Sequence, residues 1–354
     1  MPKNKFATLL LFVLTFAAAF AQKPEDVIHP GEVWLDNRGI PIEAHGGGIL
    51  HFHHTYYWVG EDRTQTNDPT KRYVGCYSST DLIHWTFLKQ LAFADPEHIG
   101  PHWILERPKV FYNEPTKKFV LYIHLDGPAV NNTDPNATGY KLARVGVYTS
   151  DRIDGPYTYI HSFRPLDQES RDIGQFVDDD GTAYLIFESR PTKGFFIAQL
   201  SEDYLTIAKQ TAFIPARLEG GAVVHYKDLY YVIGSHLSGW APNPNVYATA
   251  STLSGPWTEM QDIAPPETNT YGSQSSFLLK VSGSKGTTVI YMGDEWKPKE
   301  LWDSRYLWMP LDIGAAILKL PAPAPWSLNV KTGVAIVLPA SIPSSPPLNS
   351  DPPR

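Results

Sequence analysis

Polar side chains stand at the start of five successive strand-like stretches of the sequence. They occupy residues 43–45 (Glu-Ala-His), Glu106, Asp172, Glu219 and Gln274. Carboxyl groups held close together repel one another when ionised, so at least one of them keeps its proton near neutral pH. A protonated carboxyl group on one side of a glycosidic bond, with an activated water on the other, is the minimum that hydrolysis of that bond requires. The residue types therefore indicate acid-assisted hydrolysis, provided that the fold brings these positions together.

The element that carries each polar residue is best defined between residues 217 and 240. Glu219 opens a short apolar run, a polar turn follows at Lys227 and Asp228, and residues 229–234 form a second run rich in β-branched and aromatic side chains. This pattern is typical of a β-hairpin. Similar stretches recur along the chain, and they group into five passes: 47–60 with 73–85, 108–124 with 144–157, 175–187 with 194–200, 217–240 with 245–257, and 275–280 with 287–292 and 305–310.

The passes follow one another at intervals of roughly 50 to 60 residues, which suits a four-stranded propeller blade. A sandwich or an open barrel would also use many short strands. The sequence has hardly any amphipathic helix that would cover the face of an open sheet. We therefore predict an all-β protein, a five-bladed β-propeller. The first strand of each blade would line the central channel, and the five polar positions would face one shared pocket.

Composition limits the kinds of partner that the protein has. The 354 residues carry a formal net charge of −7, so an extended basic surface for nucleic acid or for an anionic membrane is not expected. Aromatic residues make up 13% of the chain. Flat rings stack on sugar faces, and Trp58, Trp103 and Trp240 are candidates for such contacts. The single cysteine, Cys76, lies in a strand-like run and excludes an internal disulfide, so we expect a buried, unreactive thiol.

The two ends of the sequence differ from the rest. Residues 1–21 combine two early lysines, an apolar run and Ala19-Phe20-Ala21, a pattern typical of a cleavable signal peptide. Export to the periplasm or out of the cell is therefore expected. Residues 22–343 form the predicted propeller domain, and the Pro- and Ser-rich residues 344–354 form a tail that we expect to be flexible. The protein is expected to be a monomer.

Two groups of potential metal ligands are better explained without a metal. His51, His53 and His54 flank a strand residue and a turn, with no further ligand at a fixed spacing. The acidic residues 178–180 precede Gly181 and suit a tight hairpin turn, since a calcium loop needs additional spaced ligands. No metal and no other cofactor is therefore predicted.

Seven short motifs, in order, resemble those of glycoside hydrolase family 43, and within it the exo-β-1,3-galactanase branch. They are His-Gly-Gly-Gly (45–48), Tyr-Tyr-Trp-Val-Gly-Glu (56–61), Glu-Arg-Pro-Lys-Val (106–110), Ser-Arg-Asp (170–172), Ser-Gly-Trp-Ala-Pro-Asn (238–243), Ser-Gln-Ser (273–275) and Asp-Ser-Arg (303–305). The similarity runs from about residue 31 to about residue 326. It implies the five-bladed fold, hydrolysis with inversion, no catalytic metal, and plant-type galactan or arabinogalactan side chains as substrate.

The resemblance also implies roles for individual residues. Glu219 matches the general acid, and Asp172 matches the acid that orients the sugar and tunes the pKa of the general acid. Residues 44–46 (Ala-His-Gly) lack the aspartate base of the wider family. In the galactanase branch an amide matching Gln274, assisted by a glutamate matching Glu106, is proposed to position or activate water. The substrate-binding positions implied by the motifs are Glu61, Trp240, His45, His124 and Asn243.

Each of these assignments competes with a simpler interpretation. Glu219, Glu106 and Asp172 each have an arginine nearby in sequence, at positions 217, 107 and 171, and could form structural ion pairs. The residues after Glu219 read Gly-Gly-Ala where relatives more often have Ala-Pro-Ala, which leaves the exact sugar open. An α-L-arabinofuranosidase or β-xylosidase of the same family is one alternative function. A propeller that binds carbohydrate without cleaving it is another.

Overall fold

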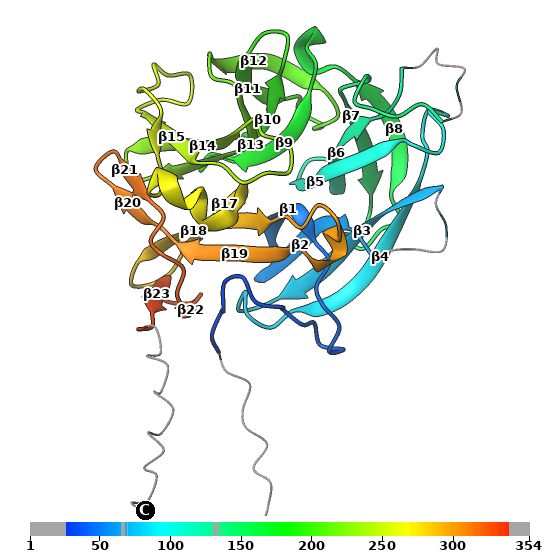
Figure 1. The fold of residues 1–354 in the computed structure, drawn as a ribbon. Coiled ribbons are helices and arrows are strands. Elements are labelled where there is room, and N and C mark those ends of the chain that lie inside the picture. The colour runs from blue at the N-terminus through cyan, green and yellow to red at the C-terminus, as the bar shows by residue number, and fades with distance from the viewer. Residues whose placement is uncertain (1–25, 65–67, 69, 130–133, 135, 340–354) are drawn as a thin grey trace, which may run out of the picture.

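The computed structural model describes residues 26–64, 68, 70–129, 134 and 136–339, and it is a five-bladed β-propeller (Figure 1). Four blades are four-stranded antiparallel sheets, and the fifth contains three strands among the described residues. The first four blades are β1–β4 (His45–Phe52, Thr55–Asp62, Lys71–Ser79, Thr86–Ala94), β5–β8 (Ile104–Asn113, Lys118–Asp126, Arg144–Ser150, Thr158–Phe163), β9–β12 (Arg171–Val177, Ala183–Ser189, Gly194–Leu200, Ile207–Ile214) and β13–β16 (Leu218–Tyr226, Leu229–His236, Asn245–Ala250, Gln261–Asp262).

The fifth blade comprises β17 (Gln274–Ser282), β18 (Thr287–Glu295) and β19 (Arg305–Pro310). Two small hairpins follow it: β20 (Asp312–Gly314) with β21 (Ile317–Lys319), and β22 (Trp326–Asn329) with β23 (Val334–Val337). The helices of the described residues are four short 3₁₀ turns: η1 (Pro165–Asp167), η2 (Pro266–Thr268), η3 (Thr270–Gly272) and η4 (Leu301–Asp303). None of them is long and apolar enough to cross a membrane.

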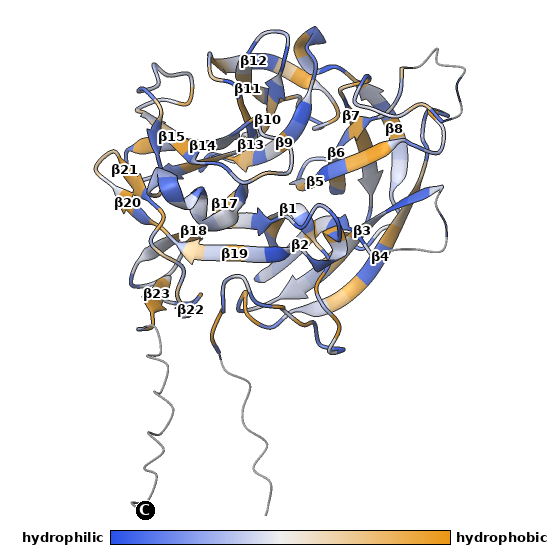
Figure 2. Ribbon diagram, in the orientation of Figure 1, coloured by the Kyte–Doolittle hydropathy of each residue, from blue (hydrophilic) through white to orange (hydrophobic). Residues whose placement is uncertain are grey.

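The first strand of every blade lies at the centre of the ring. β1, β5, β9, β13 and β17 contact one another in that order, and β17 returns to β1. These inner strands are buried along most of their length, whereas the outer strand β4 alternates between exposed and buried residues. Figure 2 shows the corresponding mixture of hydrophilic and hydrophobic residues along β4. Whether buried and exposed residues alternate along a strand therefore depends on the distance of that strand from the propeller axis.

The hydrophobic core is divided among the spaces between neighbouring blades. One cluster joins the first and second blades through Val59 and Leu121. Two others join the second blade to the third and the third to the fourth. A larger, aromatic-rich cluster joins the fourth and fifth blades to the first, and it contains Trp58 and Trp308. Because each blade has a packed partner on both sides, the sheets need no helical cover.

Residues from both ends of the described chain close the ring. Ile28 and Trp326 form an isolated antiparallel bridge, with N···O distances of 2.7 and 3.0 Å. The Gly31 amide donates to the carbonyl of Tyr306 in β19 at 2.9 Å. The Tyr306 hydroxyl in turn donates to the Ile42 carbonyl and accepts from the Ala44 amide, each at 2.8 Å. The segment before β1 is thereby fixed to the last blade.

The structure corrects one prediction on aromatic residues and confirms another on Cys76. Trp58 and Trp103 are 1% and 0% exposed, so they are core residues rather than sugar platforms. Cys76 is fully buried, and burial raises the pKa of its thiol to about 12, as expected of an unreactive cysteine. The predicted signal peptide (1–21) and tail (344–354) lie outside the described residues.

Candidate active site

A β-bulge at the start of each inner strand shapes the site. In the second blade Glu106 lies opposite His124, but the next aligned pair is Lys109 with Tyr122, so the inner strand has one extra residue. In the fourth blade Glu219 lies opposite Ser235, and the next pair is Ala222 with Ile233. The other inner strands show the same kind of shift. A bulge redirects the side chains near it, and here it does so at the same end of all five strands.

Backbone conformation shows which residues are equivalent. Gly46, Arg107, Asp172 and Gly220 all have positive φ, of 56°, 49°, 41° and 61°. Asp172 is thus equivalent to the residue after Glu106 and after Glu219, so our alignment of Asp172 with those two glutamates was offset by one position. An aspartate tolerates this conformation better than most residues, and such strain at a strand end is common in functional sites.

The two glycines after Glu219 have a steric explanation. A Cβ on Gly220 would lie 2.5 Å from the carbonyl oxygen of Ser275, and one on Gly221 would lie 1.7 Å from the Phe195 ring. At such distances either the glycine backbone or its neighbour, the Ser275 carbonyl or the Phe195 ring, would have to move. The Gly-Gly pair therefore allows β13 to pack against its neighbours while Glu219 keeps its place, and it accounts for the departure from Ala-Pro at this position.

The bulged strand ends surround one cavity of about 200 Å³. Seven of the nine residues predicted from the sequence line it: Glu61, Glu106, His124, Asp172, Glu219, Trp240 and Gln274. The wall also includes Arg63, Arg107, Tyr140, Arg171, Arg190, Gly239 and Trp296. Residues from all five blades, more than 200 positions apart in the sequence, therefore meet around a single space.

Glu219 is the carboxyl group of this cavity that keeps its proton most strongly. Burial raises its pKa, and the charge of Asp172 raises it further, to about 8, against the opposing effect of Arg107. Its side chain accepts a hydrogen bond from Gln274 Nε2 at 2.9 Å, and Arg190 lies 3.7 Å from the other carboxyl oxygen. A carboxylic acid that is still protonated at neutral pH can act as a general acid.

Gln274 is held by four hydrogen bonds. Its Oε1 accepts from an Arg107 guanidinium nitrogen at 2.5 Å and from Trp296 Nε1 at 2.9 Å. Its Nε2 donates to Glu219 at 2.9 Å and to Ser235 Oγ at 3.0 Å. The donors around Oε1 fix the orientation of the amide. The arrangement makes Gln274 a rigid bridge between Glu219 and Arg107.

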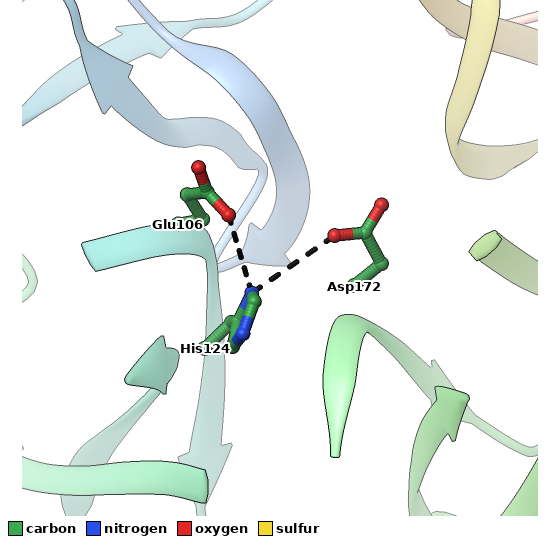
Figure 3. Close-up of side chains that lie close together, drawn as sticks. All are labelled: Glu106, His124 and Asp172. Atoms are coloured by element: carbon green, nitrogen blue, oxygen red, sulfur yellow. Dashed lines mark ion pairs between the residues drawn. The ribbon is translucent and has the colours of Figure 1, made fainter. Parts of the chain in front are cut away.

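Glu106, His124 and Asp172, which also line the cavity, form a cluster of their own (Figure 3). His124 Nδ1 lies 3.3 Å from Glu106 and 3.9 Å from Asp172, and its Nε2 lies 3.1 Å from Asp126. Burial alone would lower the pKa of His124, but the hydrogen bond to Asp126 and the adjacent carboxylate of Glu106 outweigh it and raise the pKa to about 10. His124 is therefore a buried cation.

This cation keeps Glu106 ionised. Burial favours the neutral acid, but His124, Arg63 and Tyr140 outweigh it and lower the pKa of Glu106 to about 2. The Tyr140 hydroxyl donates to Glu106 at 2.8 Å, and Arg63 lies 3.3 Å away. The site thus holds one protonated and one ionised glutamate, on different blades.

Two groups of side chains in the described residues are close enough to hold a metal ion. In Glu106–His124–Asp172 the possible ligand atoms lie within 4.8 Å of one another, but a protonated imidazole is not a ligand. Arg107 also donates to Asp172 at 3.0 Å. The second group, Asp178–Asp179–His225, is bound by Lys280 and Tyr230. Ion pairs and hydrogen bonds account for both groups.

The aromatic wall of the cavity is formed by two tryptophans. Trp240 is 38% exposed, and its ring meets that of Trp296 edge to face, with centroids 5.1 Å apart. Asn243, predicted to bind substrate, does not line the cavity. Its side chain bonds the backbone of His236 at both ends, at 2.9 and 2.7 Å, and also Ser238. Asn243 thereby closes the loop that carries Trp240.

His45 and Glu61 lie side by side on paired strands, but only Glu61 reaches the cavity. His45 is fully buried between Asp294, at 3.2 Å, and Glu43, at 3.6 Å, and these acids raise its pKa to about 9 against the effect of burial. Glu61 accepts a hydrogen bond from the Arg107 amide at 2.8 Å and pairs with Arg63. His45 therefore supports the site from within the protein.

Sequence reasoning missed the arginines and Trp296. The sequence suggests ion pairs between neighbouring residues, whereas in the structure Arg107 pairs with Asp172, and Arg171 pairs with Glu169 and Asp126. Successive residues of a strand point to opposite faces, so a side chain seldom pairs with the one beside it. Arg107 was visible as part of the motif at 106–110, but nothing local to the sequence indicated Arg190 or Trp296.

Comparison with known proteins agrees with this geometry. The family model for glycosyl hydrolases family 43 matches residues 42–277. Among solved structures, an exo-β-1,3-galactanase from Phanerochaete chrysosporium, in complex with β-1,3-galactotriose, is 39% identical with a TM-score of 0.79, covering 88% of this chain and 70% of its own. An exo-β-1,3-galactanase from Clostridium thermocellum is 32% identical with a TM-score of 0.78, covering 91% of this chain and 70% of its own. No curated protein matches the sequence.

A third structure, a putative exo-β-1,3-galactanase from Bifidobacterium bifidum, is 31% identical with a TM-score of 0.74, covering 83% of this chain and 96% of its own. A propeller whose inner strands deliver a protonated and an ionised carboxyl group to one cavity defines a glycoside hydrolase. The chain belongs to glycoside hydrolase family 43.

Proposed function

We propose that the protein removes single galactose residues from the ends of β-1,3-linked galactan chains, with inversion of configuration. The observation that carries this proposal is Glu219, a buried carboxyl group with a pKa raised to about 8, in a cavity shared with the ionised Glu106. The similarity to exo-β-1,3-galactanases, one of them in complex with β-1,3-galactotriose, supports the choice of sugar and linkage. Galactan or arabinogalactan side chains of the plant type are the proposed natural substrate.

The size of the cavity supports exo action. Its volume of about 200 Å³ is below the roughly 300 Å³ at which pockets for drug-sized ligands begin. Such a space suits one terminal sugar rather than a chain running through it. Trp240 and Trp296, at the wall, offer apolar ring surface for a sugar face.

In the proposed reaction Glu219 donates its proton to the glycosidic oxygen while the bond from that oxygen to the anomeric carbon breaks. A water molecule adds to the anomeric carbon from the opposite face, and its proton passes to Glu106. Gln274 holds Glu219 in place, and the charge of Asp172 keeps the acid protonated. Gln274 is a neutral amide whose Oε1 already accepts two hydrogen bonds, so the carboxylate of Glu106 is the proposed proton acceptor.

The proposal is tested with β-1,3-galactotriose and proton NMR of the first product. We expect α-galactose to appear first and to mutarotate later, and kcat/KM to fall above about pH 8 as Glu219 ionises. Release of arabinose or xylose from a substrate panel, in place of galactose, would favour the other family activities. Binding without any product would favour a carbohydrate-binding propeller.

Glu219→Gln tests the acid itself. We expect a loss of about 10³-fold or more on galactotriose, and a much smaller loss on an aryl β-galactoside whose acidic phenol leaves without a proton. Glu114→Gln, at an exposed glutamate paired with Lys117, is the matched control and should retain full activity. Full activity of Glu219→Gln on galactotriose would reject the assignment.

Export is also proposed from residues 1–21, and a mature chain starting at Gln22 would support it.

A further inference from the structure

Glu188 and Arg190 form a charged pair beside Glu219 that the proposed reaction leaves without a role. Glu188 lies near the end of β10 and is 2% exposed. Arg190 follows two residues later, and its side chain is 48% exposed and lines the cavity. Arg190 Nε donates to Glu188 at 3.1 Å, and a terminal nitrogen of the same guanidinium lies 3.7 Å from Glu219. One arginine therefore connects a buried carboxylate to the candidate acid.

A buried carboxylate at this position needs an explanation. Glu188 lies opposite Arg171 in the β-ladder, but Arg171 bonds Glu169 and the Tyr140 carbonyl. Burial raises the pKa of Glu188, and the charge of Asp172 raises it further. An isolated charge here would be costly, and Arg190 is the hydrogen-bonded cation that opposes this rise in pKa. In return, Glu188 holds the arginine at the cavity wall.

The charges around Glu219 come from three strands and one turn. Asp172 faces it from β9, Arg107 from β5, and Glu188 with Arg190 from β10 and the turn that follows. The neutral groups in contact are Gln274 on β17 and Ser235 on β14, which bond each other. When Glu219 gives up its proton it becomes a third anion beside Asp172 and Glu188. Arg107 is already engaged by Asp172 and Gln274, whereas a terminal nitrogen of Arg190, a residue of the cavity wall, lies 3.7 Å from Glu219.

We propose that Glu188 and Arg190 are a positioning pair that acts on the reaction through Glu219, with Arg190 balancing the negative charge that this carboxyl group acquires when it donates its proton. The inference rests on the proposed role of Glu219 as the acid. Neither member of the pair touches the reacting atoms. Arg190 stabilises the ionised form of Glu219, and Glu188 disfavours it, so their removal has opposite effects.

The test compares pH profiles of kcat/KM for galactotriose in Arg190→Gln and Glu188→Gln. In Arg190→Gln the decrease of kcat/KM on the alkaline side should begin about half a pH unit or more higher, and kcat should fall, because Glu219 holds its proton more tightly. In Glu188→Gln the same decrease should begin at a lower pH. Arg190→Lys restores the charge and should return the onset of the decrease toward that of the unaltered protein. Arg152→Gln, which removes a similarly paired arginine far from the cavity, should leave the profile unchanged.

A direct titration separates this proposal from the one on which it rests. NMR of the Glu219 carboxyl carbon should show its pKa rising in Arg190→Gln and falling in Glu188→Gln, whether or not a variant is active. Shifts in the same direction, or no shift, would overturn the pair while leaving Glu219 as the acid. If Glu219→Gln were fully active, both proposals would fail.

Discussion

Glu106 and Glu219 occupy the same position in two blades, yet they differ in protonation. Each precedes the positive-φ residue of a bulge and starts an inner strand. The difference lies across the ladder, where Glu106 faces the cationic His124 and Glu219 faces the neutral Ser235. The pKa is lowered to about 2 in the first case and raised to about 8 in the second. The cross-strand cation His124 is thus the main group that lowers the pKa of Glu106, whereas Glu219, opposite a neutral residue, is left to burial and the charge of Asp172, which raise its pKa.

Removal of the cationic partner should have the largest effect on stability. His124→Gln leaves Glu106 and Asp126 buried without their shared cation, and breaking such a pair costs about 3–5 kcal/mol. Urea unfolding of the variant and of the unaltered protein would measure the difference. A loss below about 1 kcal/mol would show that His124 is not the charge that holds this side of the site.

Replacing Glu219 by glutamine and replacing Glu106 by glutamine should change the stability of the protein in opposite directions. The folded-state pKa of Glu219 lies above its unfolded value of about 4.5, so its contribution to stability falls as pH rises from about 4.5 to 8. Glu219→Gln should therefore be more stable than the unaltered protein by about 2–4 kcal/mol at pH 8, a gain that disappears near pH 5.

Glu106→Gln provides the matched comparison. Its folded-state pKa is lowered, so the ionised form stabilises the fold above about pH 4.5, and this contribution is lost as pH falls toward 2. The variant should be less stable at both pH 5 and pH 8. Thermal unfolding at the two pH values measures both variants, and a stabilised Glu106→Gln would contradict the assignment of charges.

Removal of the neutral cross-strand partner, the hydroxyl of Ser235, should have the smallest effect on stability. Ser235→Ala removes the hydrogen bond from Gln274 Nε2 and a longer one, of 3.4 Å, from the Ser235 hydroxyl to the Glu219 carbonyl, and it leaves the bond from the Gln274 amide to the Glu219 carboxyl group. We expect a cost of about 1 kcal/mol, visible as a small decrease in melting temperature. A loss as large as that of His124→Gln would mean that the cross-strand position matters for packing rather than for charge.

The sequence was informative about position and poor about pairing. The strand pattern placed a polar residue at the start of each inner strand, and the structure has Glu106, Asp172, Glu219 and Gln274 in the first three residues of theirs. This worked because strand periodicity and turn residues are local properties. The offset of Asp172 was missed, because a bulge is defined by the register of two strands and not by either alone.

The charge network depends on distant neighbours. Arg107 bonds Asp172 and Gln274, which lie 65 and 167 positions further along the chain, and Arg190 reaches Glu219 from the next blade. Nothing in the local sequence encodes these distances. The same holds for Trp58 and Trp103, whose burial depends on the packing of neighbouring blades and strands.

The bridge between Ile28 and Trp326 has a consequence for the order of events during synthesis. A ribosome makes Ile28 early and Trp326 about 300 residues later. One side of the first blade therefore has no blade to pack against until nearly the whole chain has emerged. The cavity is also incomplete before then, because Gln274, which bonds Glu219, and Trp296, which bonds Gln274, are made late. A nascent chain stalled before the fifth blade would therefore be catalytically silent even with every carboxylate already made.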